Sequence, residues 1–527
     1  MYKIFWEIQI CSLIKGNSLN FISRIFLIIP FVSILSILGC QTCPFKKKSV
    51  ELNDVHSKLN ATTVLEVLTP ESAQEITANA RKPKKEKKTN SKCKKKKEMG
   101  GQQLGEATIQ ISMKEMNDVL GFDREKGIVT VEAGITWPVL IDYLLKNQAD
   151  SKTPWGIRQK QTGADYLSVG GALSANAHSR GIHYKPIIED VVSFTLVDAE
   201  KKKKKVSRNE NKELFSLVIG GYGLFGVIAT VDLQLGPRQK LERRVEVVAM
   251  EDLPVKAEER IKEGAVYGDY QYKTDEKADD FMRRGVLATY HPVPMDTPMP
   301  ENQKSISKEK WEHLVVLAHT DKTKAFDLYS QHYLSTNGQM YWSDTHQLSF
   351  YFHDYHDYVN TAMGNAKGSL MITEVYVPRK DITAFIEKII EDERAYHFNI
   401  IYGTMRLIKK DDESFLAWAK DDYACVIFNL RVDHSPDGLI KAERDFQRLI
   451  DRGLEFGGSY FLTYHRWARK DQVLAAYPQF REFLNLKLKY DPEERFQSEW
   501  YRHYKKMFAA ELQENSSLRS SYLLCCV

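Results

Sequence analysis

The chain has 527 residues and 43% hydrophobic content, with 26 Tyr and 24 Phe, which suffices for about two or three folded domains. Its net charge of +5 is local, because Arg81 to Lys97 holds eleven basic residues and one Glu, and Lys201 to Lys205 adds five more. Outside these two runs 59 basic residues face 69 acidic ones, which argues against nucleic acid as a partner of the folded body.

The cysteines predict neither a metal site nor a disulfide framework. Cys40-x-x-Cys43 has no second pair at ligand spacing and no βαβ pattern around it. The seven residues concerned are Cys11, Cys40, Cys43, Cys93, Cys425, Cys525 and Cys526.

Residues 1–40 are predicted to be a targeting segment. Basic residues precede the apolar run Ile25 to Leu38, which is shorter than a bilayer-spanning helix of about 20 residues. The run leads into Gly39-Cys40, which resembles a bacterial lipobox, where the Cys is lipidated and becomes the mature N-terminus. A lipoprotein and an uncleaved anchor are the two alternatives, and both predict membrane association on the periplasmic side.

The next elements alternate between strands and helices. We expect a strand at Val64 to Leu68 and a helix after Pro70, then strands at Thr108 to Ile111 and Val129 to Glu132. Trp137 to Leu145 follows as an amphipathic helix that begins with Pro138. Lys201 to Lys205 is expected to be a solvated hairpin.

A glycine-rich element, TGADYLSVGGALSANAHSRG, spans Thr162 to Gly181. Its small side chains would let backbone N–H groups approach an anion, although a tight turn against a helix is the simpler interpretation of Gly170-Gly171 alone. A second cluster, GGYGLFG, contains G-x-G-x-x-G at Gly221 to Gly226. A Rossmann motif needs a strand before it and a helix after it, but here Asn211 to Leu217 looks helical and the residues from Val227 alternate like a strand. The Rossmann interpretation is therefore rejected.

Together these motifs resemble the FAD-binding domain of the vanillyl-alcohol oxidase / p-cresol methylhydroxylase (PCMH) family. Three ordered patterns carry the resemblance: VEAGITWPVL from Val131, the glycine-rich element, and GGYGLFGVIATVDLQL up to Leu235. Within the family the chain is most similar to bacterial aldonolactone and alditol oxidases and to decaprenylphosphoryl-ribose 2′-oxidase. The resemblance implies an α+β fold, with a two-subdomain PCMH-type FAD-binding domain and an α+β substrate-covering cap domain.

The resemblance also implies a set of cofactor-binding residues. In relatives a glycine loop before this set often carries a His that is covalently bonded to the flavin, but Lys97 stands at that position here, within Lys94 to Lys97. Non-covalent FAD is therefore expected, and the lysine run puts FAD affinity in question. The residues expected to bind FAD are Gly100, Gly101, Gln102, Thr162, Gly163, Gly170, Gly171, Ala172, Ser174, Ala175, Asn176, His178, Gly181, Gly221, Gly226, Val227 and Ile228.

A domain boundary is placed near Gly236-Pro237, where the composition changes. Beyond it, Leu314 to Ala318, Ser369 to Tyr376 and Cys425 to Val432 are expected to form an antiparallel sheet, with a covering helix at Asp381 to Glu391. The expected domains are 1–40 (targeting), 50–236 (FAD-binding), 237–440 (cap), 441–510 (a segment returning to the flavin, with a turn at Tyr490-Asp491-Pro492) and 511–527 (tail).

Candidate catalytic residues lie on strand-like runs in the cap and in the returning segment. They are Glu374, Tyr402, Arg406, Tyr464, His465 and Arg466. His465 would be a general base if its pKa were near neutrality, and a purely structural role for Tyr464 and His465 is the alternative. The active-site Lys of the ribose-oxidase relatives, near the Tyr464 position, is absent, so their substrate cannot be assumed.

The leading hypothesis is an FAD-dependent oxidoreductase that oxidises an alcohol group of a sugar, polyol or aldonolactone by hydride transfer to flavin N5. Its partner would be a small polyhydroxylated substrate, and oxygen, a quinone or a redox protein would accept the electrons. The alternatives are a flavin-free membrane-anchored binding protein, suggested by the lysine run, and a same-fold reductase of a lipid or sterol double bond.

Overall fold

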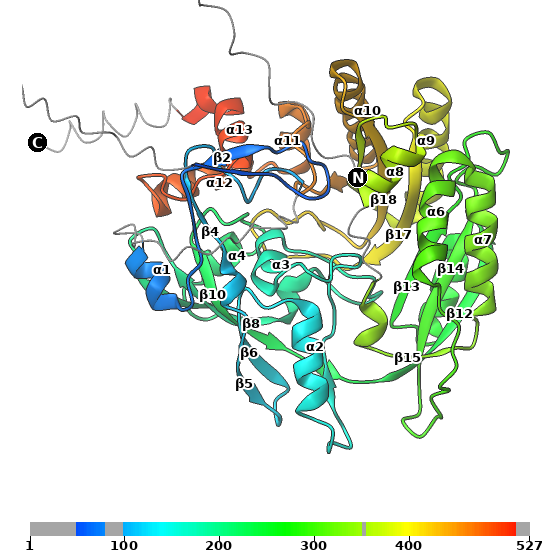
Figure 1. The fold of residues 1–527 in the computed structure, drawn as a ribbon, viewed down its shortest axis with the longest axis horizontal. Helices are drawn as coiled ribbons and strands as arrows, with labels where there is room; N and C mark the ends of the chain where they lie inside the picture. Colours follow the sequence, from blue (N-terminus) through cyan, green and yellow to red (C-terminus); the bar gives the residue numbers. More distant parts are fainter. Residues whose placement is uncertain (1–48, 80–98, 350–354, 513–527) are drawn as a thin grey trace, which may run out of the picture. The chain divides into compact units, whose positions relative to one another are not determined.

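The computed structural model describes residues 49–79, 99–349 and 355–512. The chain divides into two units, Met1–Lys47 and Lys48–Val527, and every described residue belongs to the second. The targeting segment, the run Lys94 to Lys97 and most of the predicted tail lie outside the described residues. The mixture of helices and strands confirms the expected α+β class (Figure 1).

The described chain opens with a small βαβ unit. Strand β1 (Val50–Leu52) pairs antiparallel with β2 (Thr62–Val64). Strand β3 (Glu66–Leu68), helix α1 (Ala73–Asn79) and strand β4 (Ile109–Ile111) follow, and β3 and β4 are parallel, as a βαβ unit requires. The single strand expected at Val64 to Leu68 is two strands, which part at the exposed Leu65.

A five-stranded antiparallel sheet forms the centre of this half, in the order β5-β6-β10-β8-β9. Helix α4 comes before the GGYGLFG motif and strand β10 after it, which confirms the rejection of a Rossmann motif. The predicted lysine hairpin is the β8–β9 hairpin at the sheet edge. The bounds are β5 (Val119–Asp123), β6 (Ile128–Glu132), α2 (Trp137–Lys146), α3 (Val169–Ala175), β8 (Val191–Val197), β9 (Lys203–Ser207), α4 (Lys212–Val218) and β10 (Val227–Gln234), with short helices η1 (Met113–Glu115) and η2 (Ile187–Asp190).

The chain then enters a second, eight-stranded antiparallel sheet, in the order β15-β12-β14-β13-β17-β18-β16-β19. The chain passes from the first sheet to the second at β11 (Gly236–Pro237), which pairs with β7 (Trp155–Gly156). The strands predicted at Ser369 to Tyr376 and Cys425 to Val432 are confirmed. The bounds are β12 (Lys240–Ala249), β13 (Tyr267–Tyr272), β14 (Arg284–Val293), β15 (Met340–Trp342), β16 (Gly368–Pro378), β17 (Ile400–Ile408), β18 (Tyr423–Asp433) and β19 (Ser459–Tyr460).

Helices cover both faces of this sheet (Figure 1). Residues at alternate strand positions, such as Val375 and Phe428, pack against α9 (Ile382–Tyr396) and α10 (Pro436–Glu455) in one apolar core. The opposite face carries α6 (Lys308–Thr320), α7 (Lys322–Ser335) and α8 (Tyr355–Ala362). The remaining helices are α5 (Leu253–Lys262), η3 (Thr345–Gln347) and η4 (Arg379–Asp381).

The strand expected at Leu314 to Ala318 is wrong, because these residues lie within helix α6. A five-residue apolar run has no period that separates strand from helix. The residue that favours a helix lies before this run: the Ser307 hydroxyl accepts a hydrogen bond from Lys310 N and caps the helix.

The C-terminal segment forms helices α11 (Lys470–Ala476), α12 (Phe480–Tyr490) and α13 (Glu499–Met507). The ring centroids of Trp500 and Tyr222 lie 4.6 Å apart, so α13 packs on the GGYGLFG loop. Helix α12 ends at the predicted Tyr490-Asp491-Pro492 turn, where Asp491 accepts the Phe496 amide. Within the described ranges, no helix has the length and apolar content to cross a membrane.

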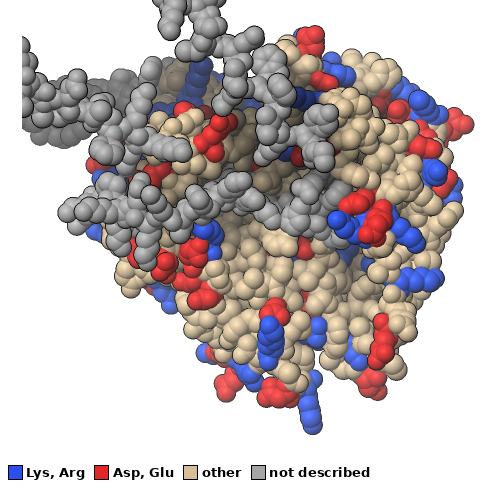
Figure 2. Space-filling model, viewed as in Figure 1, with Lys and Arg blue, Asp and Glu red and all other residues tan. Residues whose placement is uncertain are grey.

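Charged side chains of both signs are interspersed over the face of the molecule seen in Figure 2.

Candidate functional site

One cavity of about 1890 Å³ extends from the first half of the molecule to the large sheet. It is larger than the roughly 300–1,000 Å³ of an ordinary small-molecule site. One side is built from residues of the glycine motifs, and the other from one face of the eight-stranded sheet with helices α6 and α7. This volume can hold a dinucleotide and a second molecule beside it.

Most of the predicted cofactor residues line this cavity. They are Gln102, Thr162, Gly163, Gly170, Gly171, Ser174, Ala175, Gly226, Val227 and Ile228. The amides of the glycine pair were expected to approach an anion, but both already donate within the protein. Gly170 N donates to Ala133 O at 2.8 Å, and Gly171 N donates to Ser168 Oγ. A Cβ at Gly170 would lie 2.8 Å from that of Ala133, so the glycine allows α3 to pack closely on the end of β6.

The other predicted cofactor residues lie behind the cavity wall. Asn176 ends α3 with a positive φ and bonds Asp411, and Gly181 bridges to Tyr267. A Cβ at Gly100 would meet Thr463 O at 2.6 Å. The full set that supports the wall without lining it is Gly100, Gly101, Ala172, Asn176, His178, Gly181 and Gly221.

The part of the cavity that the glycine motifs line has room for an elongated cofactor. Gly163 and Gly223 both line it with φ near +78° and +75°, and a Cβ on either would project into open space. Gly134 also lines it, and a Cβ there would overlap Met113 O. Side chains at these three positions would either strain the backbone or fill the space, so the residues present fit a bound FAD.

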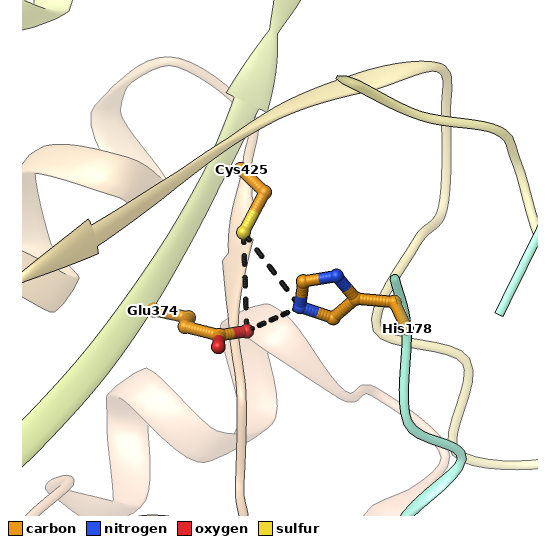
Figure 3. Close-up of side chains that lie close together, drawn as sticks. All are labelled: His178, Glu374 and Cys425. Atoms are coloured by element: carbon orange, nitrogen blue, oxygen red, sulfur yellow. Dashed lines mark hydrogen bonds and ion pairs between the residues drawn. The ribbon is translucent and has the colours of Figure 1, made fainter. Parts of the chain in front are cut away.

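On the sheet side, Glu374 of β16 is the centre of a buried cluster (Figure 3). Its Oε2 lies 2.7 Å from His178 Nε2 and also accepts the Tyr376 hydroxyl, while its Oε1 accepts the Tyr464 hydroxyl at 2.7 Å. The Cys425 thiol points at the same pair, 3.8 Å from Glu374 Oε2 and 3.9 Å from His178 Nε2. The cluster joins the loop after α3 to β16 and β18, and so fixes the two halves of the cavity wall to each other.

Hydrogen-bond geometry sets the charges in this cluster. His178 Nδ1 faces the carbonyl of Ser179 and Nε2 faces the carboxylate, so both ring nitrogens donate and the ring is an imidazolium. Burial alone raises the pKa of Glu374, but the charge and hydrogen bond of His178 and the bond from Tyr464 outweigh it and lower that pKa to about 2. Burial and the neighbouring Glu374 raise the pKa of Tyr464 far above its usual range, so this phenol keeps its proton.

Arg406 of β17 faces the same cavity with unused donors. Its Nε and Nη1 are buried and have no hydrogen-bond partner among the described residues. The predicted Tyr402 lies four positions earlier on β17, faces the cavity and is 42% exposed. The structure therefore brings four of the six predicted catalytic residues, Glu374, Tyr402, Arg406 and Tyr464, into one wall.

The other two predicted catalytic residues, His465 and Arg466, do not reach the cavity. Burial lowers the pKa of His465 to about 3, and Trp467 N donates to its Nδ1, so the expected base near neutrality is wrong. The Arg466 guanidinium donates to Asn60 Oδ1 and lies beside Gly101, so it ties the loop between β1 and β2 to the C-terminal segment.

Several residues of the site were missed by sequence reasoning. Thr404 shares a face with Tyr402 and Arg406, so the period of two along β17 could have revealed it. Asn429 interrupts the apolar run from Ala424 to Leu430 in β18 and gives a similar signal. The pairing of His178 with Glu374 leaves no such signal, because 196 positions separate them.

Comparisons with known proteins agree with this geometry. Residues 64–206 match the family model described as FAD binding domain. The chain is 36% identical over 131 residues to rice mitochondrial L-galactono-1,4-lactone dehydrogenase 1, covering 25% of this chain and 21% of that protein. It is 36% identical over 131 residues to mouse L-gulonolactone oxidase (25% and 28%) and 31% identical over 121 residues to Arabidopsis cytokinin dehydrogenase 5 (23% and 21%).

The fold and the cavity thus define a flavoprotein architecture, in which a glycine-lined half faces a sheet that carries polar groups. The chain contains an FAD-binding domain of the PCMH type, which confirms the resemblance drawn from its motifs. The alignments cover 21% to 28% of the length of these relatives.

Proposed function

We propose that this protein is an FAD-dependent oxidoreductase that oxidises an alcohol group of a sugar, polyol or aldonolactone. The observation that carries the proposal is the hydrogen-bonded pair Tyr464–Glu374, which shares one cavity with the glycine motifs of the FAD-binding domain. The relatives named as lactone oxidases and dehydrogenases support the same chemistry.

The residues that would hold FAD are those of the glycine-lined half, chiefly Gly134, Gly163, Gly170, Gly171, Gly223 and Gly226 with Ser174 and Gln102. Bound FAD supplies an acceptor for the hydride that leaves the carbinol carbon.

The chain supplies the path for the hydroxyl proton. The Tyr464 proton is donated to Glu374 Oε1, and the Tyr464 oxygen accepts a long hydrogen bond of 3.4 Å from Gln161 Nε2. Its second lone pair remains to accept a hydrogen bond from the substrate hydroxyl. As the carbonyl forms, the substrate proton moves to Tyr464 while the phenol proton moves to Glu374. Proton transfer of this kind contributes typically 10²–10⁴-fold to rate.

Arg406 would hold the substrate against this pair. Its free Nε–H and Nη1–H groups point in different directions in the guanidinium plane, so they would donate to two separate substrate oxygens. A substrate held at two points places one chosen carbon over the flavin, and such positioning is the main contribution of the protein in flavin chemistry.

The visible spectrum of the purified protein tests the proposal. We expect flavin bands that pass into the supernatant on acid precipitation and that bleach when a polyol or aldonolactone is added without oxygen. A folded, colourless protein that FAD cannot reconstitute would favour the flavin-free binding protein, and bleaching by a reductant but by no alcohol would favour the reductase. Reoxidation by oxygen, a quinone or a redox protein then identifies the acceptor.

We further propose that residues 1–40 hold the protein at a membrane, through lipidation of Cys40 or as an uncleaved anchor. The apolar run ahead of Cys40 supports this. Expression with labelled palmitate tests it: label in the membrane fraction that is lost in Cys40→Ser supports the lipoprotein, unlabelled protein in that fraction supports the anchor, and unlabelled soluble protein contradicts both.

A further inference from the structure

A row of side chains leads away from Glu374 across the floor of the cavity. In the sheet register Glu374 lies opposite Ile427, Ile427 opposite Thr404, and Thr404 opposite Gln271. All four residues line the cavity. Neighbouring strands lie about 4.8 Å apart, so the row is roughly 14 Å long and exceeds the width of a single sugar ring.

Polar atoms around this row lack partners among the described residues. They are the Thr404 hydroxyl and Asn429 Oδ1, and Asn429 is only 2% exposed. Asn429 faces the cavity from β18, opposite Tyr402. A buried polar group without a partner is unfavourable, so these atoms favour a bound molecule that supplies hydrogen bonds here.

His346 adds a third unused group to the cavity lining. Its Nδ1 donates to the carbonyl of Trp342, and burial beside Arg180 holds its pKa well below the usual range, so the ring is neutral. Its Nε2 is therefore an acceptor, and it has no partner among the described residues. A hydroxyl group of a ligand would satisfy it.

Aromatic rings line the same cavity from helices α6 and α7 and from β15. Trp311 lies on α6, Tyr329 and Tyr333 lie on α7, and Tyr341 and Trp342 lie on β15. Sugars present hydroxyl groups at their edges and C–H groups on their faces, so a cavity with both aromatic rings and unpaired polar atoms suits them. An aliphatic tail would leave the polar atoms buried and unpaired.

We infer that the row Gln271–Thr404, with Asn429, is a distal carbohydrate subsite, and that the substrate is a polyol or sugar with a second sugar unit attached. The inference rests on the proposed function, since it places the oxidised unit at Tyr464 and Glu374 and the second unit over Thr404 and Gln271. The substrate is thus larger than a single aldonolactone.

The test compares substrates that share one oxidisable unit. With full-length, FAD-loaded protein, kcat/KM is measured for sorbitol and for its two glucosides, maltitol and cellobiitol. We expect at least one glucoside to be preferred by about tenfold or more, as one or two extra hydrogen bonds provide. Thr404→Val and Asn429→Leu should each raise KM for that glucoside severalfold to tenfold with kcat little changed.

A binding measurement keeps the test independent of turnover. Calorimetric titration of FAD-loaded protein, kept reduced without oxygen so that no turnover occurs, should give a Kd for the preferred glucoside that rises by the same factor in both variants. The matched control is Thr289→Val, which removes a hydroxyl bonded to His291 and absent from the cavity lining. It should leave the Kd unchanged.

The outcomes separate the two proposals. If no alcohol bleaches the flavin, the proposed oxidation fails, and the glucoside titration still tests the subsite. If sorbitol is oxidised as well as both glucosides and the variants match the wild type, the subsite is wrong and the oxidation stands. If Asn429→Leu fails to fold, the test rests on Thr404→Val, at a partly exposed position, and on whether the wild type prefers a glucoside to sorbitol.

Discussion

At the scale of single residues, Glu374 decides what the site can do. A buried carboxylate normally resists ionisation, yet the imidazolium of His178 and two phenol donors keep this one charged. Its charge fixes the direction of the Tyr464 hydrogen bond, so the phenol presents an acceptor to the cavity.

Glu374→Gln should destabilise the fold by about 3–5 kcal/mol, because it leaves the buried His178 cation without its counter-charge. The pKa of Glu374 is lowered from 4.5 to about 2, so its contribution is fully present above about pH 4.5 and is lost as pH falls towards 2. The gap between wild type and variant in urea unfolding should therefore close on acidification. The exposed Glu391→Gln is the control, and a gap that does not change with pH would contradict the assignment.

Tyr464→Phe should lower kcat by about 10²–10⁴-fold while the flavin bands remain, because it removes the proton acceptor and leaves the cofactor half untouched. Anaerobic stopped-flow reduction of the flavin measures this step directly. Tyr396→Phe, at an exposed position of α9, should behave as wild type. An unchanged rate of flavin reduction in Tyr464→Phe would contradict the proposed proton path.

At the scale of elements, the main effect of the glycine motifs is on the shape of the cavity, and hydrogen bonds donated by their amides matter less. Gly170 lets α3 pack on β6, and Gly163 and Gly223 leave space where any side chain would project. The motifs thus determine the free volume against which a cofactor can lie.

Gly223→Leu should weaken FAD binding by about tenfold or more, because the new side chain enters the cavity at a steric cost of about 1–3 kcal/mol. Gly264→Leu is a matched control, since Gly264 has a similar positive φ and open space but lies outside the cavity lining. Both variants should lose similar stability from backbone strain. FAD titration by fluorescence quenching measures the difference, and equal affinities in the two variants would remove Gly223 from the cofactor site.

At the scale of the whole molecule, the cavity is assembled from nearly the full described length of the chain. Its lining runs from the loop between β1 and β2 to the residues after α12 and includes strands of both larger sheets. A cofactor that fills it contacts both halves at once, so cofactor binding and global stability are coupled.

FAD added to cofactor-free protein at 100 times its Kd should stabilise the fold by about 2.7 kcal/mol and raise Tm in a single transition. Thermal scans by circular dichroism measure the shift. Riboflavin, which lacks the pyrophosphate and adenosine, should give a much smaller shift at the same concentration. If FAD leaves Tm unchanged, the lysine run at residues 94–97 has abolished binding.

Much of the architecture could be predicted from the sequence because its signals are local. Glycine spacing, the order of helix and strand around GGYGLFG, and the alternation in β16 and β18 depend only on neighbouring residues. The α6 helix was missed because a short apolar run is ambiguous, and His465 was misjudged because exposure cannot be read from a polar cluster in the sequence.

The sequence by itself determined the FAD-binding domain, since contiguous glycine motifs carry it. Only the tertiary structure decided which polar residues work together. Glu374 meets His178 and Tyr464 through strand register and the packing of the two halves, and burial then sets their charges. Such contacts join residues far apart in the chain, and the pKa of each group depends on neighbours that no local pattern specifies.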